Sequence, residues 1–121
     1  MVVLNSETKV SSASTDSNQD LLDQLAVEFR DSASDLLSGA DDILSAARDG
    51  AEISAGDRGS LYRVGHSMKG LAASFGYSLT SVVAHRFEDV LAELKELKPL
   101  HIDNMQIFVD TLGDLVDGTA K

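Results

Sequence analysis

The chain has 121 residues, 20 acidic against 10 basic side chains, a formal net charge of −10 and no cysteine. This length suits one domain with its own hydrophobic core, and the lack of cysteine excludes disulfides, thiolate metal sites and cysteine nucleophiles. Because the charge disfavours nucleic acid and anionic membranes, and no apolar run matches a signal peptide or a membrane span, we predict a cytoplasmic protein with no nucleic-acid or membrane partner.

The first 18 residues include seven serines or threonines and almost no apolar side chain after Val10. Such a segment buries too little apolar surface to offset its ordering entropy, so we predict a disordered tail or linker over residues 1–18. From Asp20 onward, apolar residues recur at steps of three and four, which indicates a long amphipathic helix with an acidic outer face. Its expected core positions are Leu22, Leu25, Phe29, Ala33, Leu36, Ala40, Ile43 and Ala47.

Two further amphipathic helices follow, separated by glycines. Gly50 and residues 54–56 interrupt the first helix, Asp57 is the expected N-cap of the second, and Gly76 is expected to end it. Ser78 is the expected cap of the third helix. The expected core positions are Leu61, Val64, Met68, Leu71, Ala72 and Phe75 in the second helix and Leu79, Val82, Val83, Phe87, Val90, Leu91 and Leu94 in the third.

Pro99 prevents the third helix from continuing, and a fourth is expected from about His101 to Val116. Its expected core positions are Met105, Phe108, Leu112 and Leu115. Short connections between amphipathic helices, with no strand-like alternation, predict an all-α, antiparallel up-down-up-down four-helix bundle over residues 19–118. We expect this domain to be a monomer.

The second helix carries the segment His-Ser-Met-Lys-Gly at residues 66–70. On a helical wheel His66 and Lys69 lie away from the apolar stripe, on the same face as Gly59, Gly70 and Ala73. A glycine inside a helix costs about 1 kcal/mol relative to alanine, so small residues on an exposed face indicate that something large approaches the imidazole. An ammonium beside that imidazole suits a phosphoryl group better than a metal ion.

The third helix adds His85 and Glu88, three residues apart, on its outward or groove face. If the second and third helices are antiparallel neighbours, these side chains can reach His66. A carboxylate that accepts the Nδ1 proton of an imidazole leaves Nε2 as the free nucleophile. An incidental surface contact between two exposed side chains is the alternative interpretation.

Other kinds of site lack their motifs. A di-iron bundle needs two Glu-x-x-His motifs with further inward glutamates, so we predict no metal. Residues 65–70 have glycines at both ends but lack the lysine that follows the second glycine of a phosphate-binding loop, and no Gly-x-Ser-x-Gly elbow occurs.

The motif His66-x-x-Lys69-Gly70, followed by Phe75-Gly76-Tyr77, resembles the signature of histidine phosphotransfer (Hpt) domains, four-helix modules that carry a phosphoryl group on an exposed histidine. His85 and Glu88 lie nineteen and twenty-two residues after His66, a spacing similar to that of the phospho-accepting N-terminal domain of the chemotaxis histidine kinase CheA. The stretch from Leu100 through Phe108 and Thr111 also resembles the fourth helix of that domain, so the likeness covers roughly residues 18–117.

The resemblance implies that His66 accepts the phosphoryl group through Nε2 and that Glu88 sets its tautomer, with Lys69 and His85 completing the polar network. Gly70, Ala73, Tyr62 and Arg63 would contact the partner, and Leu71 is bulkier than the small residue often found there. The chain itself would hold no cofactor and would be no enzyme, because ATP and Mg²⁺ sit on a separate histidine kinase domain. The phosphoryl group would then pass to an aspartate of a CheY-like response regulator.

Charge is unevenly distributed along the chain. Residues 57–95 contain five basic and four acidic side chains, whereas residues 20–49 contain two basic and eight acidic ones. A less negative histidine face favours docking of a receiver whose pocket is rich in carboxylates. Two alternatives stay open: a free-standing Hpt phosphorelay protein, and a helical interaction module that performs no chemistry.

Overall fold

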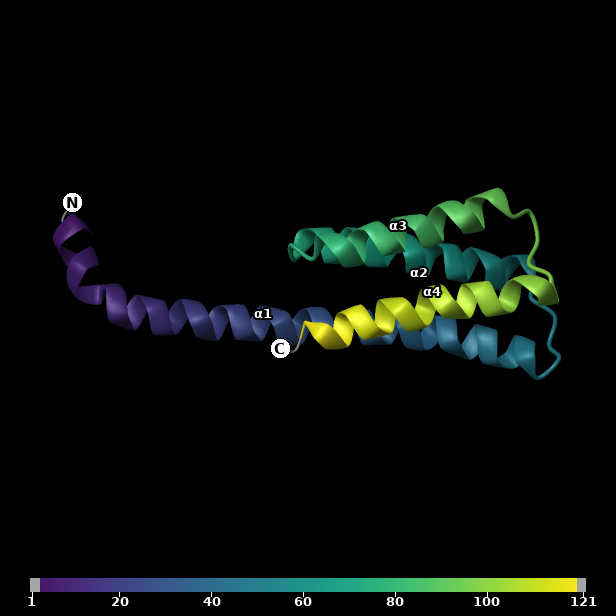
Figure 1. Cartoon of the computed structure of the whole chain (residues 1–121). Coiled ribbons are helices and arrows are strands. Elements are labelled where there is room, and N and C mark those ends of the chain that lie inside the picture. Colours follow the sequence, from purple (N-terminus) through teal and green to yellow (C-terminus); the bar gives the residue numbers. More distant parts are fainter. Residues whose placement is uncertain (1–2, 120–121) are drawn as a thin grey trace.

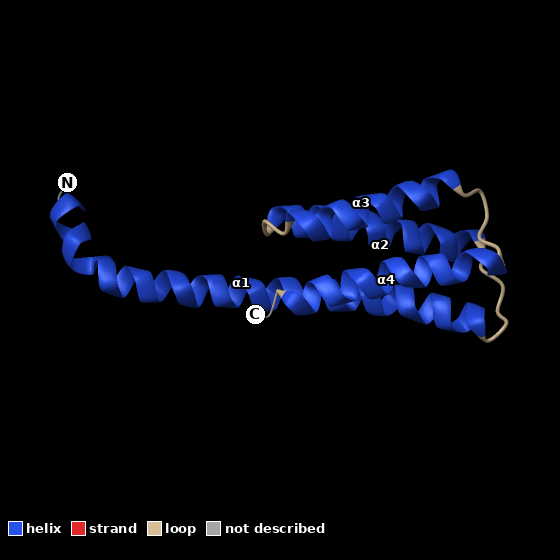
Figure 2. Ribbon diagram, in the orientation of Figure 1, coloured by secondary structure: helices blue, strands red, loops and turns tan. Residues whose placement is uncertain are grey.

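The computed structural model describes the backbone of residues 3–119 and the side chains of residues 17–119. Four helices make up this part: α1 (Val3–Arg48), α2 (Ala55–Ser74), α3 (Ser78–Glu93) and α4 (Pro99–Gly118). Residues 3–119 contain no strand, as Figure 2 shows. Each helix packs on the next and α4 closes against α1, with alternating directions along the bundle (Figure 1). The predicted all-α four-helix bundle is confirmed.

Local backbone chemistry explains where α1 and α2 end. Gly50 and Gly76 adopt φ angles of 104° and 83°, a left-handed conformation that glycine adopts without steric cost. Both glycines therefore end a helix as predicted. The predicted N-cap of α2 is wrong: the cap is Ser54, whose hydroxyl accepts from the backbone N–H of Asp57, while the Asp57 carboxylate accepts from the Ser54 N–H. This reciprocal pair is a capping box, and Asp57 is its third helical residue.

The starts of α3 and α4 also differ from expectation. Tyr77, not Ser78, is the N-cap of α3, and it forms no side-chain capping hydrogen bond. Helix α4 begins at Pro99, two residues earlier than expected, because proline fits the first turn of a helix, where its missing N–H needs no partner. Nδ1 of His101 accepts a 3.0 Å hydrogen bond from the backbone N–H of Lys98.

The N-terminal part of α1 projects beyond the ends of the other helices (Figure 1). Its backbone is helical from Val3, where the composition predicts a disordered tail. No glycine or proline precedes Gly39, so no helix-breaking residue interrupts this segment. Once the bundle portion of α1 is helical, each further residue that joins the helix adds one backbone hydrogen bond, and no new nucleation step is needed. The division of the chain at residue 18 into a tail and a bundle stays a prediction.

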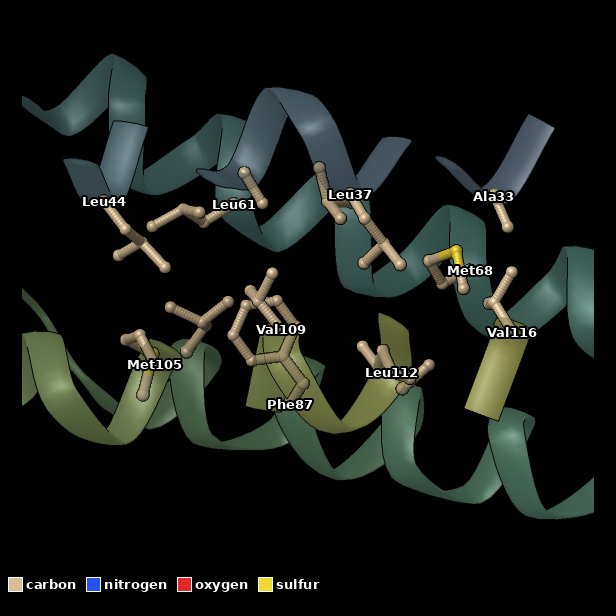
Figure 3. Close-up of a cluster of buried hydrophobic side chains, with 14 of the residues drawn as sticks. Ala33, Leu37, Leu44, Leu61, Met68, Phe87, Met105, Val109, Leu112 and Val116 are labelled. Atoms are coloured by element: carbon tan, nitrogen blue, oxygen red, sulfur yellow. The ribbon is translucent and has the colours of Figure 1, made fainter. Parts of the chain in front are cut away.

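The core lies between all four helices (Figure 3). Three predicted core positions are wrong: Leu22, Leu79 and Val82 are 59%, 63% and 63% exposed. Leu22 precedes Phe29, the first buried side chain among the described residues of α1, and α3 is rotated so that Thr80 and Ala84 are buried instead. The buried apolar side chains are Phe29, Ala33, Leu37, Ala40, Leu44, Leu61, Val64, Met68, Ala72, Ala84, Phe87, Leu91, Leu97, Ile102, Met105, Val109, Leu112 and Val116.

Helices α2 and α3 form a tightly connected hairpin. The guanidinium of Arg58 near the start of α2 donates to the backbone carbonyls of Leu94 at 2.6 Å and Leu91 at 3.2 Å. These carbonyls belong to the last turn and end of α3, where a helix leaves acceptors unsatisfied and a cation is favourable. Among the described residues, no helix has the length and apolar character needed to cross a membrane.

Candidate functional site

The site lies on the surface between α2 and α3, where α2 contributes His66 and Lys69 and α3 contributes Glu88. Ser81, about two turns before Glu88 on α3, adds a further link between the helices, because its hydroxyl donates to the backbone carbonyl of Lys69 at 3.0 Å. The antiparallel hairpin thus brings together side chains that are 22 residues apart in the sequence. This contact requires both helices, so neither helix could form the site alone.

The imidazole of His66 is open to solvent, with 64% of its side chain exposed. Its Nδ1 is hydrogen-bonded to Oε2 of Glu88. An ionised carboxylate can only accept, so Nδ1–H is the donor and the neutral ring has its lone pair on Nε2. The exposed ring therefore presents Nε2 as a nucleophile.

Glu88 is buried, with only 6% of its side chain exposed, whereas its expected position was on an outward or groove face. A helical wheel assigns the core of the bundle a single direction from the axis of α3. Glu88 points in another direction, into the contact between α3 and α2. Nζ of Lys69 donates to Oε1 at 2.7 Å. This hydrogen bond, aided by the one from His66, lowers the pKa of Glu88 below its ordinary value of 4.5, although burial acts in the opposite direction. The carboxylate is therefore ionised at neutral pH.

Lys69 occupies the border between the buried carboxylate and solvent, with 30% of its side chain exposed. We expected its ammonium to lie beside whatever the imidazole carries. In the structure the ammonium is paired with Glu88, so both groups that contact this carboxylate come from one face of α2. An incoming anion near His66 would meet an ammonium that is already held in place.

His85 lies outside the chain of contacts that joins His66, Glu88 and Lys69. Its Nε2 is 3.5 Å from Oδ1 of Asp89, one turn along the same helix. The potential ligand atoms of His85, Glu88 and Asp89 lie within 4.8 Å of one another. Both oxygens of Glu88 are already engaged, however, and an ammonium is bound to one of them. This cluster is therefore poorly suited to a cation.

The four predicted partner-binding residues, Tyr62, Arg63, Gly70 and Ala73, are all exposed on the helix that carries His66. The ring of Tyr62 lies almost parallel to the imidazole, at an interplanar angle of 11° and a centroid separation of 6.4 Å. A side chain at Gly70 would meet nothing within 4 Å. The structure leaves open space beside the imidazole, which a partner surface can occupy.

Sequence reasoning missed Gly65, which is buried where α2 meets α3. A Cβ at this position would lie 3.1 Å from Cδ2 of Phe87 and 3.3 Å from the backbone nitrogen of Glu88. A glycine inside a helix, on the side that faces a neighbouring helix, was the signal that could have revealed this close approach. Gly59, by contrast, is half-buried rather than on the open face, with the Arg63 side chain over it.

The geometry agrees with the comparison to protein families. Residues 15–118 match the Hpt domain family. No curated protein and no solved structure matches the chain at the level required for significance. The matched segment includes the whole of α2, α3 and α4 and most of α1. The chain therefore belongs to the Hpt domain family, whose members carry phosphoryl groups on histidine in two-component phosphorelays.

Proposed function

We propose that His66 accepts a phosphoryl group from an ATP-dependent histidine kinase domain and passes it to an aspartate of a CheY-like receiver, as part of a CheA-like chemotaxis kinase. The observation that supports this most strongly is the solvent-exposed imidazole whose Nδ1 is bound by the buried Glu88 carboxylate. The pairing leaves the lone pair of Nε2 on an exposed ring available for attack. The further resemblance to CheA rests on His85 and Glu88 and on the stretch from Leu100 through Phe108 and Thr111.

In the first step the lone pair of Nε2 attacks the phosphorus of the donor. A bond forms between Nε2 and phosphorus, and the bond from phosphorus to the leaving group breaks with its electron pair on the leaving group. The ring then carries positive charge and keeps its proton on Nδ1. Glu88 accepts that proton in a hydrogen bond and opposes the charge, so it stabilises the product as well as the reactive tautomer.

In the second step a carboxylate oxygen of the receiver aspartate attacks the same phosphorus. The bond between phosphorus and Nε2 breaks, its electron pair returns to the ring, and neutral imidazole is restored. Lys69 lies one turn from His66 and is fixed by its 2.7 Å hydrogen bond to Glu88. Its ammonium can attract the phosphoryl oxygens without an additional ordering cost.

The surface around His66 fits a docking partner. Gly70 and Ala73 leave room beside the ring, while Tyr62 offers an aromatic surface on the other side. Residues 57–95, which cover almost all of α2, all of α3 and the first two residues after it, have one more basic than acidic side chain in a chain of net charge −10. A receiver pocket rich in carboxylates would meet less repulsion here than at any other helix pair.

We assign ATP and Mg²⁺ to the partner kinase domain, and the proposed role of this chain is that of substrate and carrier. A free-standing Hpt protein would use the same atoms in the same way. A helical interaction module without chemistry would use the face around Gly70 and Ala73 and would bind a receiver equally well after His66→Ala.

Incubation with phosphoramidate tests the proposal without the cognate kinase, because attack on this donor releases ammonia. Mass spectrometry should locate one acid-labile phosphoryl group on His66. We expect His66→Gln to abolish labelling and His85→Gln only to slow it. His101→Gln is a matched control, because Nδ1 of His101 accepts a hydrogen bond from Lys98 and its ring has the opposite tautomer.

Addition of a CheY-like receiver to the labelled protein should then transfer the label to the receiver aspartate. Equal labelling of His66→Gln and the parent would disprove the assignment of the acceptor. Labelling of His66 without transfer to any receiver would disprove the carrier role while leaving the acceptor in place.

A further inference from the structure

Helix α2 approaches α3 most closely at Gly65, the residue before His66. An added Cβ there would lie 3.1 Å from Cδ2 of Phe87, 3.3 Å from the backbone nitrogen of Glu88 and 3.5 Å from the carbonyl oxygen of Ala84. Carbon atoms in favourable contact are about 3.5–4.0 Å apart, so the first two contacts would be repulsive. The absence of a side chain at Gly65 permits the observed spacing.

The neighbours of Gly65 have little freedom to move away. Phe87 is fully buried and packs against Phe108 with a centroid separation of 5.4 Å. The other contacts are backbone atoms of Ala84 and Glu88, four residues apart in the interior of α3, where successive turns are joined by hydrogen bonds. A side chain at position 65 would therefore displace α3 as a unit, by a few tenths of an ångström.

We propose that Gly65 is a positioning residue for phosphoryl transfer: by allowing α3 to approach α2, it places the carboxylate of Glu88 within hydrogen-bonding reach of Nδ1 of His66. The backbone nitrogen that a Cβ would contact belongs to Glu88 itself. The residue that limits the helix spacing and the residue that binds the carboxylate are consecutive in α2. Any displacement of α3 at Gly65 is therefore transmitted directly to the contact between His66 and Glu88.

The expected effect of Gly65 on the rate of phosphoryl transfer rests on the proposed function, whereas its expected effect on the tautomer of His66 does not. The structural test measures the tautomer of His66 by long-range ¹H–¹⁵N correlation spectra of the imidazole nitrogens in the unphosphorylated protein. We expect Gly65→Ala to reduce the fraction of neutral rings that carry the proton on Nδ1. Gly113→Ala is the matched control, because it is the same substitution inside α4 and its Cβ would meet nothing within 4 Å.

The kinetic test is a double-mutant cycle with phosphoramidate as the donor. A misplacement of about 1 Å can cost roughly 100-fold in rate, so a smaller displacement in Gly65→Ala should slow labelling of His66 about five- to tenfold. In a Glu88→Ala background the same substitution should slow labelling less than about twofold, because no carboxylate remains to be displaced. Gly113→Ala should leave both rates unchanged.

The outcomes separate the two proposals. An unchanged His66 tautomer in Gly65→Ala, or the same rate loss with and without Glu88, would overturn the positioning role. Any loss of labelling rate would then be attributed to a general effect of the substitution on folding. Circular dichroism of each variant checks that the helices are retained. If the parent protein takes no label at all, the proposed function fails, while the tautomer measurement still decides the role of Gly65.

Discussion

Ion pairs join α2 to α3 and α1 to α4, but their surroundings differ. Between α2 and α3, Lys69 meets a Glu88 side chain that is 6% exposed, at 2.7 Å. Between α1 and α4, Arg48 meets an Asp103 side chain that is 91% exposed, at 3.5 Å. The Glu88 carboxylate is shielded from solvent and hydrogen-bonded on both oxygens, whereas water competes with Arg48 for the Asp103 carboxylate. Burial therefore decides which of these pairs can orient a reactive group.

The two helix pairs differ in charge as well. Residues 20–49 and 99–118, which include the bundle portion of α1 and all of α4, contain twelve acidic side chains and two basic ones. Here the polar contacts are exposed, such as the 2.9 Å hydrogen bond from Gln106 to Asp41. The α1–α4 pair is thus strongly acidic, and the proposed site lies on the less acidic α2–α3 pair.

The largest expected difference concerns packing. Phe87 is fully buried on α3, while its neighbour Phe108 on α4 is only partly buried. Phe87→Ala should lower the free energy of unfolding by about 3–5 kcal/mol, as for other buried aromatic side chains. Phe108→Ala should cost about 1–2 kcal/mol, because part of that ring stays in water in the folded state. Urea denaturation followed by circular dichroism measures both, and equal losses would contradict the contrast between the helix pairs.

A smaller difference is expected for the two ion pairs. Glu88→Ala leaves Lys69 and His66 without their shared partner and should lower the free energy of unfolding by about 1–3 kcal/mol. Asp103→Ala removes an exposed partner and should change it by about 0–1 kcal/mol. The same urea experiment applies. A loss for Asp103→Ala as large as that for Glu88→Ala would show that burial does not separate the two pairs.

The smallest expected effect is a pH dependence specific to Glu88. Since Lys69 and His66 lower the pKa of Glu88 below 4.5, folding favours the ionised form. The stability that this provides is complete above the ordinary pKa and is lost as pH falls through the lower, folded-state value. The difference in urea midpoint between the parent and Glu88→Gln should therefore shrink on acidification below about pH 4.5. A difference that is constant from neutral to acid pH would exclude this contribution.

Much of the site was predictable because helical periodicity is a local property. The positions of apolar residues along α2 showed that His66 faces solvent, and the spacing of Glu88 on the next helix suggested that a carboxylate could reach it. For His85 the same reasoning was insufficient. Its side chain pairs with Asp89 on its own helix, a choice that depends on how far α3 is rotated relative to α2.

The amino-acid sequence by itself determined that four helices form, that Gly50 and Gly76 end two of them, and that an imidazole with a nearby ammonium lies on the surface. These features follow from backbone conformation and from a repeat of 3.6 residues, both of which act within one helix. Only the tertiary structure decided that Glu88 is buried, that both of its oxygens are bonded, and that Gly65 permits the contact. Those features depend on the distance and rotation between two helices, which packing of the whole bundle sets.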